Sequence, residues 1–102
     1  MLSDLNAFMP NTEGSSSGYF EYGDPHNHIF YPAIALGDVV EYELLIYNRW
    51  GNLLFVSKEV RRGWDGYYNG KLCSMDVYVW RIRCKFTSGE IVTKTGDVTL
   101  LR

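Results

Sequence analysis

One stretch of the chain alternates between two kinds of side chain over residues 77–86. The first set is apolar or aromatic and consists of Tyr78, Trp80, Ile82, Cys84 and Phe86. The second set is mostly charged and consists of Val77, Val79, Arg81, Arg83 and Lys85. A period of two is the period of a β-strand, in which successive side chains point to opposite faces. We therefore expect a long strand over 77–86 that buries one face, with Cys84 among the core residues.

A second alternating stretch lies before it, beginning at residue 39 or 40 and ending at Tyr47. Its inward set is expected to be Tyr42, Leu44 and Ile46, and its outward set Glu41, Glu43 and Leu45. Residues 48–52 are a turn, because Gly51 adopts a positive φ without steric cost, and 53–56 return as the partner strand. The pattern predicts a β-hairpin with one solvent-exposed face and one buried face.

Turn-forming residues mark the ends of further strands. Residues 87–90 are expected to turn the chain back into a strand at 91–94, and Gly96 with Asp97 is expected to break the run before a last strand at 98–101. The short extended pieces before residue 39 contain proline, which only edge strands tolerate. Six or seven strands without a helix in 102 residues favour an all-β fold, an immunoglobulin-like antiparallel β-sandwich of about seven strands.

The length supports one hydrophobic core and not two. We expect residues 1–38 to be an N-terminal arm of the same domain and residues 39–102 to be the sandwich core. Residues 11–18 are polar and rich in Ser and Gly, so they are expected to form a mobile loop. Phe8 and Pro10 are expected to tie the arm down.

Acidic and basic residues are segregated along the chain. Residues 1–48 hold seven Asp or Glu and no Lys or Arg, whereas residues 49–102 hold five acids and all ten bases. Pairing of Glu41 and Glu43 with Arg81 and Arg83 across neighbouring strands would absorb much of this asymmetry. The alternative is a basic face that docks on an acidic partner or an anionic lipid, made of Arg61, Arg62, Lys71, Arg81, Arg83 and Lys85.

No apolar run approaches the roughly 20 residues that span a bilayer. No basic and then apolar leader opens the sequence, so an export signal is expected upstream, in a longer parent protein. Cys73 lies in the loop entering the 77–86 strand, and a bond to Cys84 would need that loop to fold over the sheet. We expect two free thiols.

Catalytic patterns are missing from the sequence. No nucleophile elbow or phosphate-binding glycine loop occurs, and Glu41 and Glu43 fall on the wet face of a strand without a cleft. Asp24, His26 and His28 place a carboxylate near two imidazoles, which suits a divalent ion. Surface histidines in a polar loop are the simpler interpretation, so no cofactor and no enzymatic activity are expected.

Five motifs in order resemble a known family. They are Phe8 to Asn11 with Glu13 and Gly14, Ile46 to Gly51, Trp64 to Gly66, Asp76 to Trp80, and Gly96 to Arg102. Together they make residues 6–102 similar to the gliding motility-associated C-terminal domain, the type B sorting domain of the type IX secretion system of Bacteroidota. The first loop lacks the dense acidic pattern that would hold Ca²⁺, and Asp76 stands where the family has glycine.

The resemblance implies a folded export signal at the C-terminus of a larger protein that reaches the cell surface or the medium through the periplasm. The implied partners are the outer-membrane translocon, its shuttle components and upstream cargo domains, with no nucleic acid and with the domain as a monomer. The residues expected to be recognised are Gly96, Val98, Leu100, Leu101, Arg102, Arg49 and Trp50. The residues expected to be structural are Asn48, Gly51, Trp64, Asp65, Gly66 and Tyr78.

Two finer expectations concern the aromatic residues. Trp50 is expected to be a lid over the core, with Arg49 the more exposed member of the pair. Trp64 is expected to pack inward, while the Asp65 side chain accepts hydrogen bonds from backbone N–H groups just after it. The alternative function is a carbohydrate-binding module that uses a platform of Trp64, Tyr67 and Tyr68, or a structural immunoglobulin-like module. Tyr67 and Tyr68 are expected to be exposed.

Overall fold

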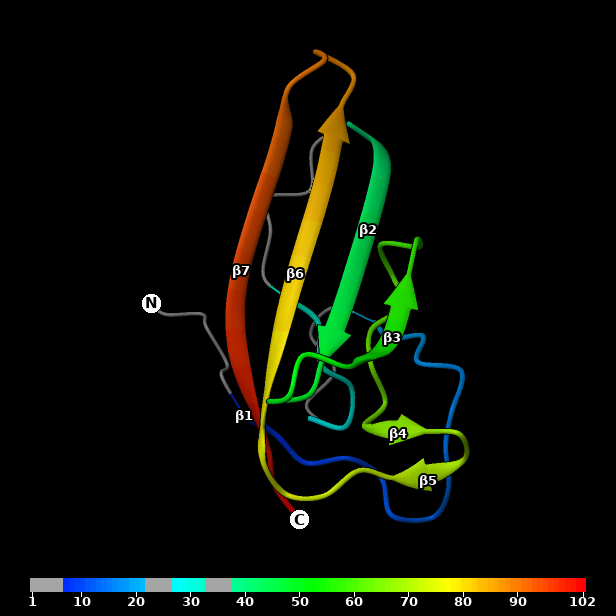
Figure 1. Ribbon diagram of the computed structural model, residues 1–102. Helices are drawn as coiled ribbons and strands as arrows, with labels where there is room; N and C mark the ends of the chain where they lie inside the picture. Colours follow the sequence, from blue (N-terminus) through cyan, green and yellow to red (C-terminus); the bar gives the residue numbers. More distant parts are fainter. Residues whose placement is uncertain (1–6, 22–26, 33–37) are drawn as a thin grey trace.

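The protein is described here by a computed structural model, which covers residues 7–21, 27–32 and 38–102. These residues form strands and loops without a helix (Figure 1). The strands are β1 (Ala7–Phe8), β2 (Val39–Tyr47), β3 (Leu53–Ser57), β4 (Tyr67–Tyr68), β5 (Lys71–Leu72), β6 (Val77–Phe86) and β7 (Ile91–Leu100). No helix in the described ranges is long and apolar enough to cross a membrane. The all-β prediction is confirmed.

Five strands form one sheet in the order β1-β7-β6-β2-β3, and β4 with β5 forms a separate two-stranded sheet. The β2/β3, β2/β6 and β6/β7 pairs are antiparallel, as expected. β1 pairs with β7 in parallel, Ala7 opposite Thr99 and Phe8 opposite Leu100, so the main sheet is mixed. The described strands do not form two full sheets packed as an immunoglobulin-like sandwich.

The expected break at Gly96 and Asp97 is wrong, because β7 runs through both residues without interruption. Gly96 lies opposite Trp80 on β6. A Cβ atom at Gly96 would lie 2.5 Å from Cζ2 of Trp80, so the indole occupies the space that a side chain would fill. The Trp80 ring nitrogen also donates a hydrogen bond to the Asp97 carbonyl oxygen, at 3.3 Å. An aromatic ring over a glycine supports a strand that the glycine alone would weaken.

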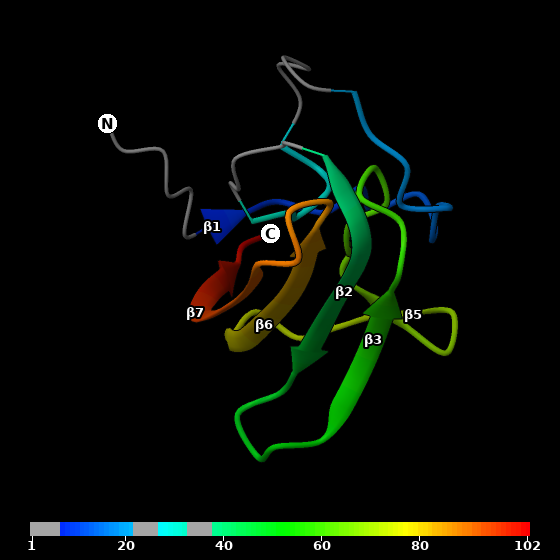
Figure 2. The ribbon, with the colours of Figure 1, turned by 90° about the horizontal axis from the view of Figure 1, so that it is seen from above.

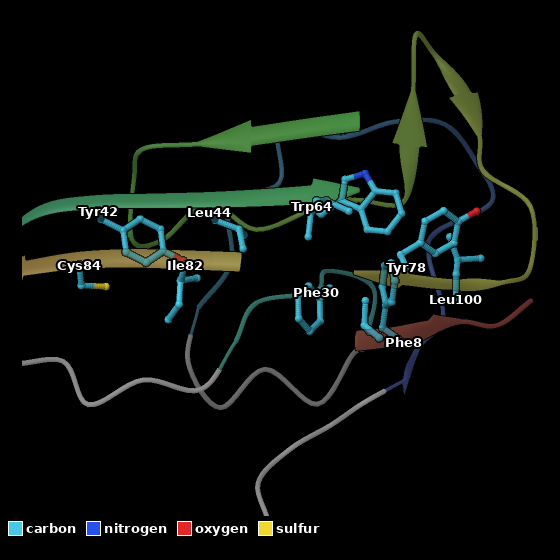
Figure 3. Packing of buried hydrophobic residues seen from close by; sticks show 11 residues of the cluster. Phe8, Phe30, Tyr42, Leu44, Trp64, Tyr78, Ile82, Cys84 and Leu100 are labelled. Atoms are coloured by element: carbon cyan, nitrogen blue, oxygen red, sulfur yellow. The ribbon is translucent and has the colours of Figure 1, made fainter. Parts of the chain in front are cut away.

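The hydrophobic core lies on one face of the main sheet (Figure 3). The alternation predicted for 39–47 and 77–86 is confirmed, and both strands send their apolar set into this core. Trp64 is fully buried, with its ring 5.5 Å from that of Phe8 and 4.9 Å from that of Tyr78. Phe30 contributes from a separate segment that forms a β-bridge with Trp64. Residues from the arm therefore complete the core, with Phe8 buried as expected.

The loop that was expected to be mobile has polar anchors on the Trp64 turn. Asp65 accepts hydrogen bonds from the backbone N–H groups of Tyr67, at 3.0 Å, and Ser16, at 2.9 Å. The Tyr67 hydroxyl donates to the Asn11 carbonyl oxygen at 2.7 Å and accepts from the Gly14 N–H at 3.2 Å. The expected Asp65 turn is confirmed, and its carboxylate also holds the arm.

The opposite face of the sheet carries the charged residues of β2 and β6. Glu41 pairs with Arg83 at 3.5 Å and with Lys85 at 3.9 Å. The Glu41–Arg83 pair is one of the cross-strand pairs expected from the sequence, whereas Lys85 was not expected to take part. Cys84 is buried, Cys73 is half-buried, and both thiols are free. In Figure 2 the described N-terminal segments, which carry Phe8 and Phe30 of the core, lie on one side of the main sheet, and no described segment covers the other side.

Candidate functional site

Several of the residues expected to be recognised meet at one end of the main sheet. There the β2–β3 turn (48–52), the loop that enters β6 (73–76) and the residues after β7 (101–102) lie together (Figure 1). We call this end the turn pole. An open depression in it is lined by Asn48, Arg49, Trp50, Leu54, Cys73, Ser74, Asp76 and Tyr78.

The tip of the turn pole is built by Asn48. Its side-chain oxygen accepts hydrogen bonds from the backbone N–H groups of Trp50, at 3.0 Å, and Asn52, at 2.9 Å. Gly51 has φ 85°, the left-handed conformation that was expected of it. An asparagine that satisfies two backbone donors in its own turn fixes the backbone there without help from the core.

Trp50 projects from this tip and is 78% exposed, so the expectation of a lid over the core is wrong. The Arg49 guanidinium lies 5.8 Å from the centre of the Trp50 ring and 3.3 Å from the Asp76 carboxylate. Asp76 in turn accepts a hydrogen bond from the Val77 N–H at 2.7 Å. The pair therefore presents an aromatic ring and a cation from a defined position.

The end of β7 separates into buried and exposed residues. Val98 and Leu100 are fully buried, whereas Leu101 is 38% exposed and Arg102 is exposed. The Leu101 N–H donates to the Phe8 carbonyl oxygen at 2.8 Å. The Arg102 guanidinium donates to the Cys73 carbonyl oxygen at 3.0 Å, which places it at the turn pole.

Two ionisable groups beneath the pole, the Cys73 thiol and the Tyr78 hydroxyl, are held in their neutral forms. Burial raises the pKa of the Cys73 thiol above its ordinary value of 9.0, and the Asp65 carboxylate raises it further, while Arg102 opposes this. Burial also raises the pKa of Tyr78, whose hydroxyl donates to the Ser74 carbonyl oxygen at 2.6 Å. A thiol that stays protonated is a poor nucleophile. The pole therefore offers a contact surface, and its chemistry does not favour covalent catalysis.

The metal candidates are only partly described. Asp24 and His26 lie outside the described residues. Nδ1 of His28 lies 2.8 Å from the Met9 carbonyl oxygen. Within the ranges that the structure covers, no group of three or more His, Cys, Asp or Glu is placed to hold a metal ion.

The aromatic platform proposed for a carbohydrate is not formed. Trp64 is 0% exposed and Tyr67 is 9% exposed, while Tyr68 alone stands out at 45%. Tyr67 is buried because its hydroxyl reaches under the 11–18 loop to the Asn11 carbonyl oxygen. The expectation that Tyr67 is exposed is therefore wrong, and a single exposed tyrosine is not a flat stacking surface.

The sequence reasoning missed two residues of the pole. Asp76 was noted only as a replacement for a glycine, yet it holds Arg49 and accepts the Val77 N–H. Met75 beside it is 61% exposed. The signal available in the sequence was an acidic residue directly before a strand, where its side chain reaches backbone N–H groups.

Comparison with known families gives one match, the CHU_C type IX secretion signal domain, over residues 5–100. No curated protein and no solved structure matches the chain. This match defines the chain as a β-rich targeting module rather than an enzyme. The chain belongs to the CHU_C type IX secretion signal domain family. Proteins sorted by this C-terminal domain are exported to the cell surface or the medium.

Proposed function

We propose that the turn pole is the surface by which the secretion machinery recognises this domain. The observation that carries the proposal is Trp50, which is 78% exposed on a turn whose backbone is fixed by Asn48. Tryptophan and arginine are enriched among the residues that dominate binding energy at protein interfaces. Arg49 lies beside Trp50 and is held by Asp76. The pole therefore presents an anchor at small conformational cost, since its position is set before binding.

The residues of the last strand divide into two roles under this proposal. Gly96, Val98 and Leu100 support the strand, because Gly96 lies under Trp80 and the two apolar side chains are in the core. Leu101 and Arg102 contact the partner, because both are exposed at the turn pole. Of the residues expected to be recognised in this strand, only Leu101 and Arg102 are therefore direct contacts, and the other three support the strand that positions them.

The partners under this proposal are the outer-membrane type IX translocon and its shuttle components. The domain acts as a monomer attached to upstream cargo domains. Residues 1–38 and 39–102 act as one domain, which is supported by the burial of Phe8 and by the β1–β7 pairing. The immunoglobulin-like relationship is kept as a proposal: β4 and β5, with the bridges of Tyr19 to Arg62 and Phe30 to Trp64, serve as a reduced second layer.

Export of a fluorescent reporter tests the proposal. Residues 1–102 are fused behind a periplasmic signal peptide and the reporter, in a bacterium with a working type IX system. Trp50→Ala is expected to lower export strongly, because loss of a tryptophan anchor of about 2 kcal/mol weakens binding about thirtyfold. Removal of residues 101–102 is expected to lower export as well.

Tyr68→Ala is the matched control, since Tyr68 is an exposed aromatic residue on β4 that does not line the depression of the turn pole. Resistance to proteolysis shows that each variant is folded. Periplasmic retention of folded Trp50→Ala with normal export of Tyr68→Ala supports recognition at the pole. Equal export of both variants contradicts it and favours a module whose recognition residues lie elsewhere.

A further inference from the structure

The open face of the main sheet has an apolar half that the core does not use. Two rows of neighbouring residues cross it: Val79 lies opposite Tyr47, which lies opposite Leu53, and Arg81 lies opposite Leu45, which lies opposite Val56. Val77 extends the first row along β6. We call Leu45, Tyr47, Leu53, Val56, Val77 and Val79 the outer band.

Four residues of the outer band are substantially exposed to solvent. Leu53 is 46% exposed, Val79 41%, Val56 40% and Val77 39%. In Figure 2 the described N-terminal segments lie on the other side of the sheet, so they leave this side uncovered. Single exposed apolar residues are ordinary, but a contiguous set across three strands is typical of an interaction surface.

One cation borders the outer band without a partner. Of the three basic residues that β6 places on this face, Arg83 and Lys85 both pair with Glu41. Arg81 forms no ion pair with any described residue, although it lies between Leu45 on β2 and Thr95 on β7. An arginine at the edge of an apolar surface that forms no ion pair with a described residue is complementary to a carboxylate on a partner.

We propose that the outer band and Arg81 form a second docking surface, for a protein segment that presents apolar side chains flanked by a carboxylate. A protein segment fits this surface better than an anionic membrane does, because the face carries both charge signs, with Glu43 and Asp97 beside the cations of β6, and so does not attract an extended anionic surface as a whole. A single carboxylate on a protein segment, by contrast, can be placed directly on the Arg81 guanidinium. This second surface would act in addition to the turn pole. The proposal rests on the sorting function in one respect, which is that the partner is encountered during export.

Site-directed photo-crosslinking in secreting cells tests the proposal on the full reporter fusion. A benzophenone amino acid replaces Val56 in the outer band or, as a control, Val40, which is 54% exposed on β2 outside the band. Each is combined with Arg81→Gln or with the matched control Arg83→Gln. Adduct yield is measured on gels, and mass spectrometry maps the crosslinked segment.

The proposal expects an adduct from position 56 and little from position 40. Arg81→Gln is expected to lower the yield about tenfold, the effect of one charge-assisted contact, whereas Arg83→Gln leaves it unchanged. The mapped segment should be apolar with an Asp or Glu beside it. An adduct with lipid, with a second copy or with the fusion's own upstream part overturns the proposal. An adduct yield that Arg81→Gln leaves unchanged overturns it as well.

Export is measured on the same cultures so that the two proposals fail separately. Loss of the position-56 adduct in Arg81→Gln, together with normal export of Trp50→Ala, supports the outer band and contradicts the turn pole. The reverse result, export that depends on Trp50 with no specific adduct at position 56, leaves the turn pole standing and removes the outer band.

Discussion

Two turns of this chain place a tryptophan one or two positions before a positive-φ glycine, and the two tryptophans lie in opposite environments. Trp50 is 78% exposed and Trp64 is 0% exposed. The local devices are nearly the same, because Gly51 and Gly66 both have φ 85°. Each turn also has an Asn or Asp side chain that accepts a hydrogen bond from a backbone N–H two residues later.

The difference lies in what surrounds each turn. Trp64 forms a bridge with Phe30 and packs on the rings of Phe8 and Tyr78, so segments far apart in the sequence cover it. Trp50 stands at the end of a two-stranded hairpin with the Arg49 guanidinium 5.8 Å from its ring. Turn chemistry therefore sets the backbone, while tertiary packing decides whether the tryptophan serves the core or the surface.

Truncation of each tryptophan gives the largest contrast. Trp64→Ala is expected to lower the free energy of unfolding by about 3–5 kcal/mol, because it leaves a cavity among Phe8, Phe30 and Tyr78. Trp50→Ala is expected to change it by less than about 0.5 kcal/mol, as for other exposed positions. Urea unfolding followed by circular dichroism measures both. Similar losses from the two substitutions would break the comparison.

Alanine at each turn glycine separates backbone strain from packing. Gly51→Ala is expected to cost about 1–2 kcal/mol from the left-handed backbone alone, since nothing lies within 4 Å of the added Cβ. Gly66→Ala bears the same strain, and its Cβ would lie 2.5 Å from Cγ of Pro10, which adds about 1–3 kcal/mol. Thermal unfolding of the two variants gives the difference. Equal melting temperatures would show that Pro10 moves aside freely.

Removal of the turn side chains gives a smaller contrast. Asp65→Ala is expected to cost about 2 kcal/mol, because its carboxylate accepts the N–H groups of both Tyr67 and Ser16 and so holds the arm as well as the turn. Asn48→Ala is expected to cost about 1 kcal/mol, since its bonds stay within one turn. Hydrogen exchange around residues 14–18 should rise in the first variant only.

The smallest expected effect is a gradual loss of folding stability at alkaline pH, caused by ionisable groups that are buried in the folded protein. Cys73, Cys84 and Tyr78 all have pKa values raised by burial above their ordinary values of 9.0, 9.0 and 10.0. The unfolded chain then loses protons before the folded chain does, so stability is full below about pH 9 and falls as the pH rises through the folded-state pKa values. Urea midpoints from pH 7 to 11 measure this. The Cys73→Ser variant should show a weaker fall between pH 9 and 10, and an identical fall would argue against the thiol.

The strands could be predicted because their signal is local. The alternation over 77–86 and 39–47, the turn at Gly51 and the inward Trp64 all follow from residues near one another, and the structure confirms them. Family membership was also predictable from the order of short motifs, and the match over residues 5–100 confirms it.

The wrong predictions concern residues whose environment is set by contacts with distant parts of the sequence. Gly96 was expected to break a strand because nothing local indicates that Trp80 lies over it. Tyr67 was expected to be exposed because its partner, the Asn11 carbonyl oxygen, belongs to a distant loop. Trp50 was expected to be buried because a tryptophan in a turn usually covers the core, whereas in this fold the 48–52 turn leaves it 78% exposed. In each case a long-range arrangement overrode a local preference.

The parallel pairing of β1 with β7 also determines when, during synthesis of the chain, the core can be completed. Phe8 and Leu100 lie opposite each other in the sheet and both are buried, yet they come from opposite ends of the described chain. Contacts between distant residues are slow to form, because a long loop must close before they contribute. During synthesis the N-terminal partner emerges long before its match. The core therefore cannot be completed until residue 100 has arrived, so a nascent chain, or one truncated before Leu100, lacks a complete core.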